Sequence, residues 1–390
     1  ERVGPEVQRQ LTEQATNPSV ETAFSPYESA VGEYLTTLPG DATVLITPQF
    51  EHHSAIKLIA RDHSHRALDV VNDLPYRSAT SGDLVYILEP ADRPLLGLMQ
   101  QIYPTGVAEE HRAETGELLF LSYVVPAADL AETRGIVGQY YINFPPVYAP
   151  DDTQREAELD LDMSAAPLES PYFALWEGTL LVPEFGDYSF GLTAEGESAS
   201  LQIGREQRLD LPQGGSGTLD ATLAAGFHPL RVEFHSGDAP GRLRLTWSGS
   251  GFSDQVVGGD ALYAFRLGDQ GLVGYYFANG EWQGDPAIVR NDLLIAPNNP
   301  LREPFSILWR GKIAIPSSGL YTFGTRSDDG SFVFIDKQLV VDNGGSHGAE
   351  DRSGQIQLDE GFHDIEVLYS ELGGSREMQL YWQPPGLGRG

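Results

Sequence analysis

The chain has 390 residues, of which 41% are hydrophobic and 10% aromatic; this is a globular composition, and the length predicts more than one domain. It carries 56 acidic residues against 25 basic ones, a formal net charge of −31 at pH 7. A nucleic-acid partner, which needs a basic surface, is therefore not expected. The absence of cysteine excludes disulfides, thiolate zinc sites and cysteine nucleophiles.

The beginning of the chain gives few structural signals. No stretch approaches the roughly 20 apolar residues of a membrane helix, and Glu1-Arg2-Val3-Gly4 does not open a signal peptide. We therefore interpret the sequence as a mature product or an excised soluble part. A targeting or membrane segment is expected upstream. Residues 1–25 are predicted to form an N-terminal arm.

Residues 26–128 alternate between helical and extended patterns, which predicts a small α/β domain with a parallel or mixed sheet. Helices are expected over residues 27–38, 55–61 and 93–103. Strands are expected over residues 42–47, 68–71, 83–88 and 118–125.

The same region contains histidines that could suggest a zinc site. His52, His53, His63 and His65 lack any recognised ligand spacing, so no metal is expected there. The chain also lacks the motifs of a serine-hydrolase elbow, a phosphate loop and a dinucleotide site. Acidic pairs are too common in so acidic a sequence to indicate a glycosidase. We therefore predict that the chain is not an enzyme.

The rest of the chain contains an internal repeat. Residues 135–141 (GIVGQYY) match residues 271–277 (GLVGYYF), an offset of 271 − 135 = 136. Residues 176–183 match residues 309–316 with an offset of 309 − 176 = 133, and three further blocks follow in the same order. Units of this length indicate a duplicated domain and not a solenoid, whose repeats are much shorter.

Both copies consist of short runs in which apolar and polar residues alternate, separated by turns rich in Gly, Pro, Asn and Asp. This pattern predicts antiparallel strands with one buried face, packed as a sandwich or barrel. The expected organisation is thus multidomain: the α/β domain, then all-β sandwiches at residues 135–265 and 271–387, with breaks near residues 126–129 and 267–270.

The most informative segment lies in the second copy. Ser327-Asp328-Asp329-Gly330 separates two aromatic strand patterns, at residues 320–324 and 331–336. Adjacent carboxylates repel each other, and neighbouring side chains of an extended chain point to opposite sides. A loop that keeps both acids is typical of a site for a hard cation, and calcium is the natural candidate.

Residues 271–385 resemble the PA-fourteen β-sandwich module, named after the anthrax protective antigen and also found in yeast flocculation adhesins and bacterial glycosidases. The resemblance lies in the opening GLVGYY, the Trp-x-Gly before a Pro-x-Ser-Gly-x-Tyr-x-Phe pattern, Ser-Asp-Asp-Gly, Val341-Asp342-Asn343 and Gly361-Phe362-His363. Residues 135–250 fit the same family more loosely.

In adhesin-like members, the resemblance implies a Ca²⁺ ion held by two successive aspartates joined through a cis peptide, with an asparagine and backbone carbonyls from a neighbouring loop. Asp328 and Asp329 match the pair. Asn343, which precedes the glycine-rich loop 344–350, is the third candidate metal ligand. The loop residues Ser346 and His347 join the aspartates as candidate contacts to a bound ligand; His347 and Glu350 are weaker as metal ligands.

A Ca²⁺ ion with two open positions can be met by two vicinal hydroxyls of a sugar, which predicts a calcium-dependent carbohydrate-binding protein. Two other readings stay open: a purely structural ion, and a simple polar turn. The first copy has Thr193-Ala194-Glu195-Gly196-Glu197 in place of the paired aspartates and no asparagine in the later loop. It is predicted to keep the fold without the calcium site, as a spacer or packing partner.

The N-terminal α/β region resembles the soluble domain of bacterial membrane glycosyltransferases of the dolichyl-phosphate-mannose type, through residues 34–42, 83–90 and 102–106. The expected partners are glycans or a cell-surface polysaccharide, with membrane attachment through an upstream segment and self-association both possible. The expected location is extracellular or at the cell surface. Alternatives are the ectodomain of a membrane glycosyltransferase and a structural, filament-forming surface protein.

Overall fold

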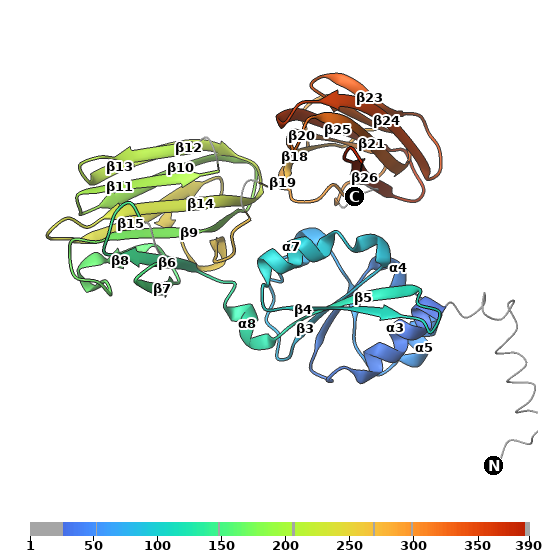
Figure 1. The fold of residues 1–390 in the computed structure, drawn as a ribbon, viewed down its shortest axis with the longest axis horizontal. Coiled ribbons are helices and arrows are strands. Elements are labelled where there is room, and N and C mark those ends of the chain that lie inside the picture. The colour runs from blue at the N-terminus through green and yellow to red at the C-terminus, as the bar shows by residue number, and fades with distance from the viewer. Residues whose placement is uncertain are drawn as a thin grey trace, which may run out of the picture. The chain divides into compact units, whose positions relative to one another are not determined.

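The computed structural model describes residues 26–386, except residues 52, 147–148, 205–206, 268–269 and 298. The arm predicted for residues 1–25 lies outside the described residues. The chain divides into two compact units, residues 1–133 and 134–390 (Figure 1). Among the described residues, no helix is long and apolar enough to cross a bilayer.

The first unit contains a five-stranded sheet with the strand order β2-β1-β3-β5-β4. β1 pairs with β2 and β3 in parallel, whereas β5 pairs with β3 and β4 in antiparallel fashion, so the sheet is mixed, as predicted. The strands are β1 (Thr43–Ile46), β2 (Arg66–Ala67), β3 (Leu84–Leu88), β4 (Val107–Arg112) and β5 (Leu118–Val125).

Helices pack on both faces of this sheet because the central strands are apolar on both sides. On one face, Val31 and Leu35 of α3 lie in a core with Val85 and Ile87 of β3. On the other face, the hydroxyl groups of Tyr86 and Tyr103 lie 3.3 Å apart at the end of α7. The helices are α3 (Pro26–Thr37), α4 (Pro48–Glu51), α5 (Ser54–Ile59), α6 (Val70–Asp73), α7 (Leu95–Ile102) and α8 (Ala127–Ala131).

The strand predicted over residues 68–71 is wrong. The edge strand β2 ends at Ala67, and residues 70–73 form the short helix α6. The side chain of Asp69 accepts hydrogen bonds from the backbone N–H groups of Val71 and Asn72. This N-cap satisfies donors that a strand would have paired with a neighbour, so the local capping interaction outweighs the β-propensity of the two valines.

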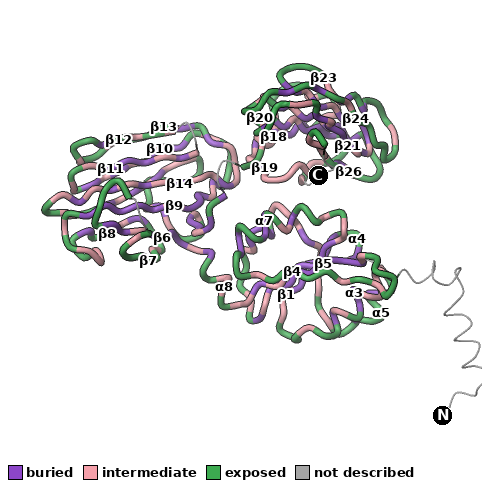
Figure 2. The backbone as a smooth tube through the Cα atoms, viewed as in Figure 1, coloured by how far each residue is buried: buried purple, intermediate pink, exposed green. Residues whose placement is uncertain are grey.

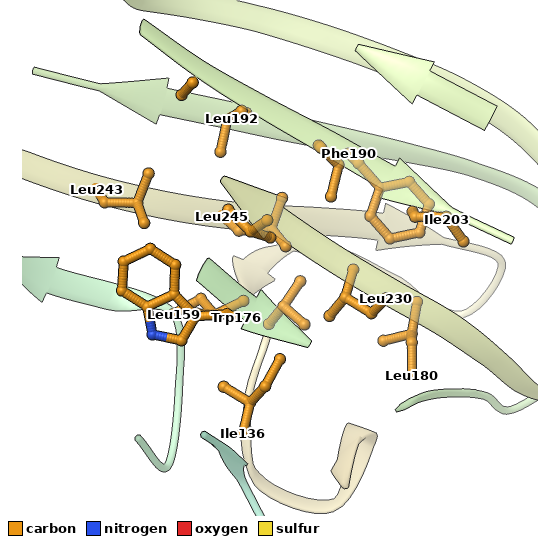
Figure 3. Close-up of a cluster of buried hydrophobic side chains, with 14 of the residues drawn as sticks. Ile136, Leu159, Trp176, Leu180, Phe190, Leu192, Ile203, Leu230, Leu243 and Leu245 are labelled. Atoms are coloured by element: carbon orange, nitrogen blue, oxygen red, sulfur yellow. The ribbon is translucent and has the colours of Figure 1, made fainter. Parts of the chain in front are cut away.

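The first β-sandwich consists of two sheets that enclose a continuous apolar core. Figure 3 shows part of this core, in which Trp176, Leu180 and Leu230 lie among Phe190, Leu243 and Leu245. One sheet has the order β13-β10-β15-β16, and the other β12-β11-β14-β9-β6-β7. The strands are β6 (Ile136–Tyr141), β7 (Asp152–Glu156), β8 (Asp160–Asp162), β9 (Phe173–Val182), β10 (Gly186–Ala194), β11 (Ser198–Ile203), β12 (Gln207–Leu211), β13 (Gly215–Leu223), β14 (Gly226–His235), β15 (Arg242–Gly249), β16 (Phe252–Val256) and β17 (Leu262–Tyr263).

The second β-sandwich pairs a six-stranded sheet, β19-β18-β20-β25-β22-β23, with a three-stranded one, β24-β21-β26. Its core contains Trp309, Tyr321, Phe323 and Tyr369. Buried stretches of backbone run along its strands in Figure 2. The strands are β18 (Leu272–Phe277), β19 (Ile288–Asp292), β20 (Phe305–Ile315), β21 (Gly319–Asp328), β22 (Ser331–Ile335), β23 (Gln338–Asn343), β24 (Glu350–Leu358), β25 (Gly361–Glu371) and β26 (Glu377–Gln383).

The two sandwiches share one strand topology. The order β12-β11-β14-β9-β6-β7 in the first corresponds, strand by strand, to β23-β22-β25-β20-β18-β19 in the second, and β13-β10-β15 corresponds to β24-β21-β26. The register agrees as well, since Trp176 pairs with Val232 and Trp309 with Val367. This agreement lets residues of the two sandwiches be compared by position, and the predicted fold class, an α/β domain followed by antiparallel sandwiches, is confirmed.

Candidate metal and ligand site

Asp328 and Asp329 lie where the chain of the second sandwich crosses between its sheets. β21 belongs to the three-stranded sheet and ends at Asp328, and β22 begins the return in the six-stranded sheet at Ser331. The chain crosses again between β23 and β24, through residues 344–349. These crossings place the Asp-Asp-Gly turn beside the glycine-rich loop: a Cβ atom on Gly330 would lie 2.9 Å from the carbonyl oxygen of Gly345.

The peptide bond between Asp328 and Asp329 is cis, as the resemblance implies. The two side chains have different surroundings. The Asp328 side chain is half-buried and makes no hydrogen bond with the described residues, while its backbone carbonyl accepts a 2.6 Å hydrogen bond from the hydroxyl of Tyr369. Asp328 is therefore the carboxylate that is open to an incoming ion.

Asp329 is buried, and its carboxylate joins three segments of chain. Its Oδ1 atom accepts hydrogen bonds from the hydroxyl of Ser346 and the backbone N–H of His347, both at 3.0 Å. Its Oδ2 atom accepts one from the backbone N–H of Leu372 at 2.8 Å. Ser346 and His347 thus lie at the candidate site as predicted, but they contact Asp329 itself.

Asn343, the last residue of β23, is buried beneath the turn. Its side-chain Nδ2 donates to the hydroxyl of Ser327 at 3.0 Å and to the backbone carbonyl of Glu350 at 3.2 Å. Because both amide hydrogens are used in this way, the Oδ1 atom is directed away from these partners and keeps its lone pairs for another ligand. This orientation suits a metal ligand.

A ladder of buried hydroxyl groups supports the turn from below. The hydroxyl of Ser327 donates to the carbonyl of Asp329 at 2.7 Å and lies 2.8 Å from that of Ser331, which in turn donates to the hydroxyl of Thr325. All three hydroxyl residues are fully buried. These buried polar contacts connect the turn to the ends of β21 and β22 and restrict its conformation.

A further carboxylate, Glu371, lies close to the aspartates and was not among the predicted site residues. It is fully buried at the end of β25, its Oε2 lies 2.7 Å from the Tyr369 hydroxyl oxygen, and its Oε1 accepts a hydrogen bond from the Gly373 N–H. Burial and the charge of Asp329 raise the pKa of Glu371. The alternation Ile365, Val367, Tyr369 points residue 371 inward, so the strand period could have identified it.

His347 carries a ring that favours the charged form. Nε2 lies 3.1 Å from the carbonyl oxygen of Asn343 and Nδ1 lies 2.9 Å from that of Gly348. Burial works against the charge, but these two acceptors and the nearby Glu350 and Asp329 raise the pKa of His347. Its ring nitrogens are occupied by carbonyl groups, which agrees with its prediction as a weak metal ligand.

The described residues contain no group of three or more His, Cys, Asp or Glu side chains arranged to hold a metal ion. The predicted set differs from such a group because it combines two carboxylates with an amide oxygen and backbone carbonyls. These are oxygen donors of the kind that Ca²⁺ prefers over softer metals. Their chemistry therefore fits a calcium ion.

The first sandwich lacks these donors at the matching positions. In the second sandwich, Val333 pairs with both Val367 and Val341, and Asn343 follows two residues after Val341. In the first, Leu201 pairs with both Val232 and Leu209, which puts the buried Leu211 at the position of Asn343. An apolar side chain there cannot bind a cation.

The comparisons with known proteins support the predicted relationship of the C-terminal sandwich. One curated relative, the anti-sigma-I factor RsgI3 of Acetivibrio thermocellus, is 27% identical over 169 residues, which cover 40% of this chain and 26% of the relative. Another, the protective antigen of Bacillus anthracis, is 28% identical over 129 residues, which cover 29% of this chain and 16% of that protein. The chain thus spans about a quarter or less of the length of either relative.

A solved structure described as the PA14 sugar-binding domain from an RTX adhesin is 15% identical, covers 34% of this chain and 99% of its own, and superposes with a TM-score of 0.28. The resemblance of the N-terminal region to glycosyltransferase domains stays a prediction, as does family membership for the first sandwich. Residues 268–389, which include the C-terminal sandwich, match the family model of the PA14 domain.

Proposed function

We propose that the C-terminal sandwich binds Ca²⁺ through Asp328, Asp329 and Asn343 and that the bound ion binds vicinal hydroxyls of a glycan. The observation that carries the proposal is the orientation of Asn343, whose two amide hydrogens are used by Ser327 and Glu350 and whose Oδ1 stays available beside the aspartate pair. In this proposal Ca²⁺ supplies a Lewis-acidic centre with open positions, while the protein residues hold it and accept hydrogen bonds from the sugar.

The proposal includes an extracellular or cell-surface location, because glycans and free calcium are both found there. The formal net charge of −31 favours attraction of divalent cations over attraction of anions such as phosphorylated or sulfated ligands. Neutral glycans are therefore the preferred substrate class.

Calorimetric titration tests the metal step first. Asp328→Asn removes one charge from a side chain that makes no hydrogen bond with the described residues, so the variant should fold normally and bind Ca²⁺ at least tenfold more weakly. Asp342→Asn is the matched control: this exposed aspartate lies next to Asn343 but accepts its hydrogen bond from Gly344. Equal calcium affinity in the wild type and the Asp328→Asn variant would refute the proposed ligand set.

The sugar step is tested by titrating a panel of neutral glycans into the calcium-loaded and the EDTA-treated protein. Calcium-dependent binding that the Asp328→Asn variant loses would support recognition through the ion. Calcium binding without any glycan response would favour a structural ion. A structural role for the ion is supported by the hydrogen bonds that the Asp329 carboxylate already accepts from Ser346, His347 and Leu372. These bonds connect the turn to two other segments of the chain.

A further inference from the structure

The two sandwiches belong to one compact unit, and backbone hydrogen bonds connect them directly. Ala225, which precedes β14 of the first sandwich, donates its N–H to the carbonyl of Val289 at 3.1 Å and accepts the N–H of Asn291 at 2.7 Å. Both partners lie on β19, the edge strand of the six-stranded sheet in the second sandwich. The first sandwich thus occupies hydrogen-bonding groups that an edge strand otherwise leaves open.

Side chains of β19 add to this backbone contact. The Nδ2 atom of Asn291 donates to the carbonyl oxygen of Phe227 at 2.8 Å. Val289 is only 5% exposed, although it is not part of the apolar core of its own sandwich. The residue at the matching position of the first sandwich, Thr153 of the edge strand β7, is exposed. β19 therefore buries a face that the corresponding strand leaves in solvent, as expected of a docked strand.

Two equivalent glycines show how closely β19 approaches the first sandwich. Gly226 and Gly361 begin β14 and β25, and they pair with Val182 and Ile315, the last residues of β9 and β20. Both glycines have a left-handed φ, +104° and +133°. A Cβ atom on Gly226 would lie 3.0 Å from the backbone carbonyl oxygen of Asn291, whereas one on Gly361 would meet no described atom within 4 Å. Only the glycine of the first sandwich is therefore confined by a neighbouring domain.

The segment that links the sandwiches is packed against the first one. The rings of Tyr263 and Phe265 lie 5.5 and 5.9 Å from the ring of Phe227, and Leu267 is buried as well. Residues 268–271 separate this anchored segment from the start of β18. A flexible tether of four residues spans about 12 Å at most, and so short a tether gives the two sandwiches a high effective concentration for each other. A few hydrogen bonds are then enough to keep them docked.

β19 is also fixed to its own sandwich. Asp292, the residue after Asn291, accepts hydrogen bonds from the hydroxyl of Tyr276 and from Nε1 of Trp309, and both of these aromatic side chains are fully buried. Because the strand is held by the core on one side and by Ala225 on the other, the contact fixes the whole second sandwich and not a loose strand.

We propose that the first sandwich is a fixed docking partner of the second, and that β19 is the interface of one rigid two-sandwich module. The first sandwich then acts as a packing partner and not as a flexible spacer. β19 and β23 are the two edges of the same six-stranded sheet, and Asn343 of the candidate calcium site ends β23. The first sandwich therefore holds the second by the sheet edge opposite to that site.

Distance measurements between two spin labels test this rigidity in the full chain. The sequence has no cysteine, so Thr218→Cys on β13 and Gln357→Cys on β24, both exposed positions, place one label on each sandwich. Pulsed electron paramagnetic resonance in EDTA should give a single narrow distance distribution. A free tether of four residues would instead spread the distances over about 10 Å.

Gly226→Ala should at least double the width of this distribution, because the added Cβ atom pushes β19 away. Gly361→Ala is the matched control, since it places alanine at the equivalent left-handed position without a neighbouring domain, and it should leave the width unchanged. Asn291→Ala removes only the side-chain hydrogen bond to Phe227 and should broaden the distribution while both sandwiches stay folded. Near-ultraviolet circular dichroism verifies the folding of each variant.

A broad distribution in the otherwise wild-type chain, or a wild-type width in the Asn291→Ala variant, would overturn the proposal. Equal broadening by Gly226→Ala and Gly361→Ala would also overturn it, because backbone strain and not the contact with β19 would be the cause. If Gly226→Ala does not fold, Asn291→Ala decides the question. Since the proposal does not rest on calcium or glycan binding and the measurement excludes Ca²⁺, its failure leaves the proposed function unaffected.

Discussion

At the scale of single residues, Asn343 is one of the positions at which the two sandwiches differ, together with the paired aspartates. Replacing it by leucine gives the second sandwich the residue that the first has at this position, Leu211. We expect Asn343→Leu to abolish calcium binding, because no oxygen ligand replaces Oδ1. Loss of the hydrogen bonds to Ser327 and the Glu350 carbonyl should also lower the free energy of unfolding by about 1–3 kcal/mol.

Asn343→Asp is the informative companion to this variant. It keeps an oxygen ligand and adds a negative charge, so calcium binding should persist, while the apoprotein loses the two donated hydrogen bonds. Calorimetry measures the first effect and urea unfolding in EDTA the second. Wild-type calcium affinity in the leucine variant would contradict the assigned role of Asn343.

A second residue-scale feature lies in the α/β unit, at the carboxyl ends of β1 and β3. The hydroxyl of Thr47 donates to Asp92 at 2.9 Å and accepts the N–H of Glu89. Glu28 extends from α3 with a buried Oε2 atom that has no hydrogen-bond partner among the residues the structure describes. Burial and the charges of Asp92 and Glu28 raise the pKa of Glu89 to about 7.

This raised pKa predicts how the stability of the α/β unit depends on pH. A carboxyl group whose pKa is higher in the folded than in the unfolded state stabilises the fold fully below its unfolded value, and this contribution is lost as pH rises through the folded value. Stability should therefore fall between about pH 4.5 and pH 7. The change is at most about 3 kcal/mol, and less because Glu89 is only half-buried.

Glu89→Gln removes the titration, so the variant should be more stable than the wild type above pH 7 and should show a flatter pH dependence. Circular dichroism at 222 nm follows this unit, because the α-helices among the described residues all lie in it. Glu109→Gln, on the exposed strand β4, is the control. A pH dependence that Glu89→Gln leaves unchanged would exclude Glu89 as its source.

At the scale of elements, β19 is attached to the core of the second sandwich by a buried polar network. Asp292 accepts hydrogen bonds from the Tyr276 hydroxyl, from Arg290 and from Trp309 Nε1, the last at 2.8 Å. The guanidinium of Arg290 lies 4.8 Å from the centre of the Tyr276 ring. In the first sandwich, Trp176 Nε1 is buried without a partner, although Glu156 occupies the position of Asp292.

Removing the acid at these two positions should therefore have unequal effects. Asp292→Ala removes the buried carboxylate that Arg290, the Tyr276 hydroxyl and Trp309 Nε1 share, which should cost about 3–5 kcal/mol of unfolding free energy. Glu156→Ala is the matched control in the first sandwich and should cost about 1 kcal/mol or less, since Glu156 has no such partners and burial raises its pKa. Similar costs at both positions would show that the network adds no stability.

The correctly predicted helices and strands follow from local sequence patterns, and the wrong predictions also have local physical causes. The predicted strand at 118–125 coincides with β5, which is a nearly continuous apolar run, and the helix predicted at 27–38 corresponds to α3, which buries Val31 and Leu35 one turn apart. Strand β4 is not among the predicted strands, because its residues Val107–Arg112 are largely exposed and charged, as suits an edge strand. Residues 68–71 have the composition of a strand, but the capping side chain of Asp69 starts a helix there.

The candidate site likewise contains residues that the sequence predicts and contacts that only the fold creates. Asp328, Asp329 and Asn343 could be identified because their spacing and flanking strands follow a family pattern. The contact of Asp329 with Leu372, and the approach of Glu28 to Glu89 and Asp92, arise only from the fold, because Leu372 lies 43 residues from Asp329 and Glu28 lies 89 − 28 = 61 residues from Glu89.

At the scale of the whole molecule, the net charge of −31 opposes compaction, and salt and calcium should relieve this repulsion differently. Raising NaCl from about 0.01 to 0.15 M shortens the Debye length from about 30 to 8 Å, so the unfolding midpoints of both compact units should rise. The five tryptophans all lie in residues 134–390, so their fluorescence follows the second unit, while circular dichroism at 222 nm follows the first.

Calcium should raise only the fluorescence midpoint, because the proposed ligands lie in the second unit. At a concentration of about 100 times the dissociation constant, the gain in unfolding free energy is about 2.7 kcal/mol. Mg²⁺ at the same ionic strength is the control, since it screens charge equally but requires a tighter octahedral arrangement of ligands than this turn and loop offer. If Mg²⁺ raises the midpoint as much as Ca²⁺, or if the Asp328→Asn variant gains as much as the wild type, calcium acts by screening the acidic surface and the specific site is refuted.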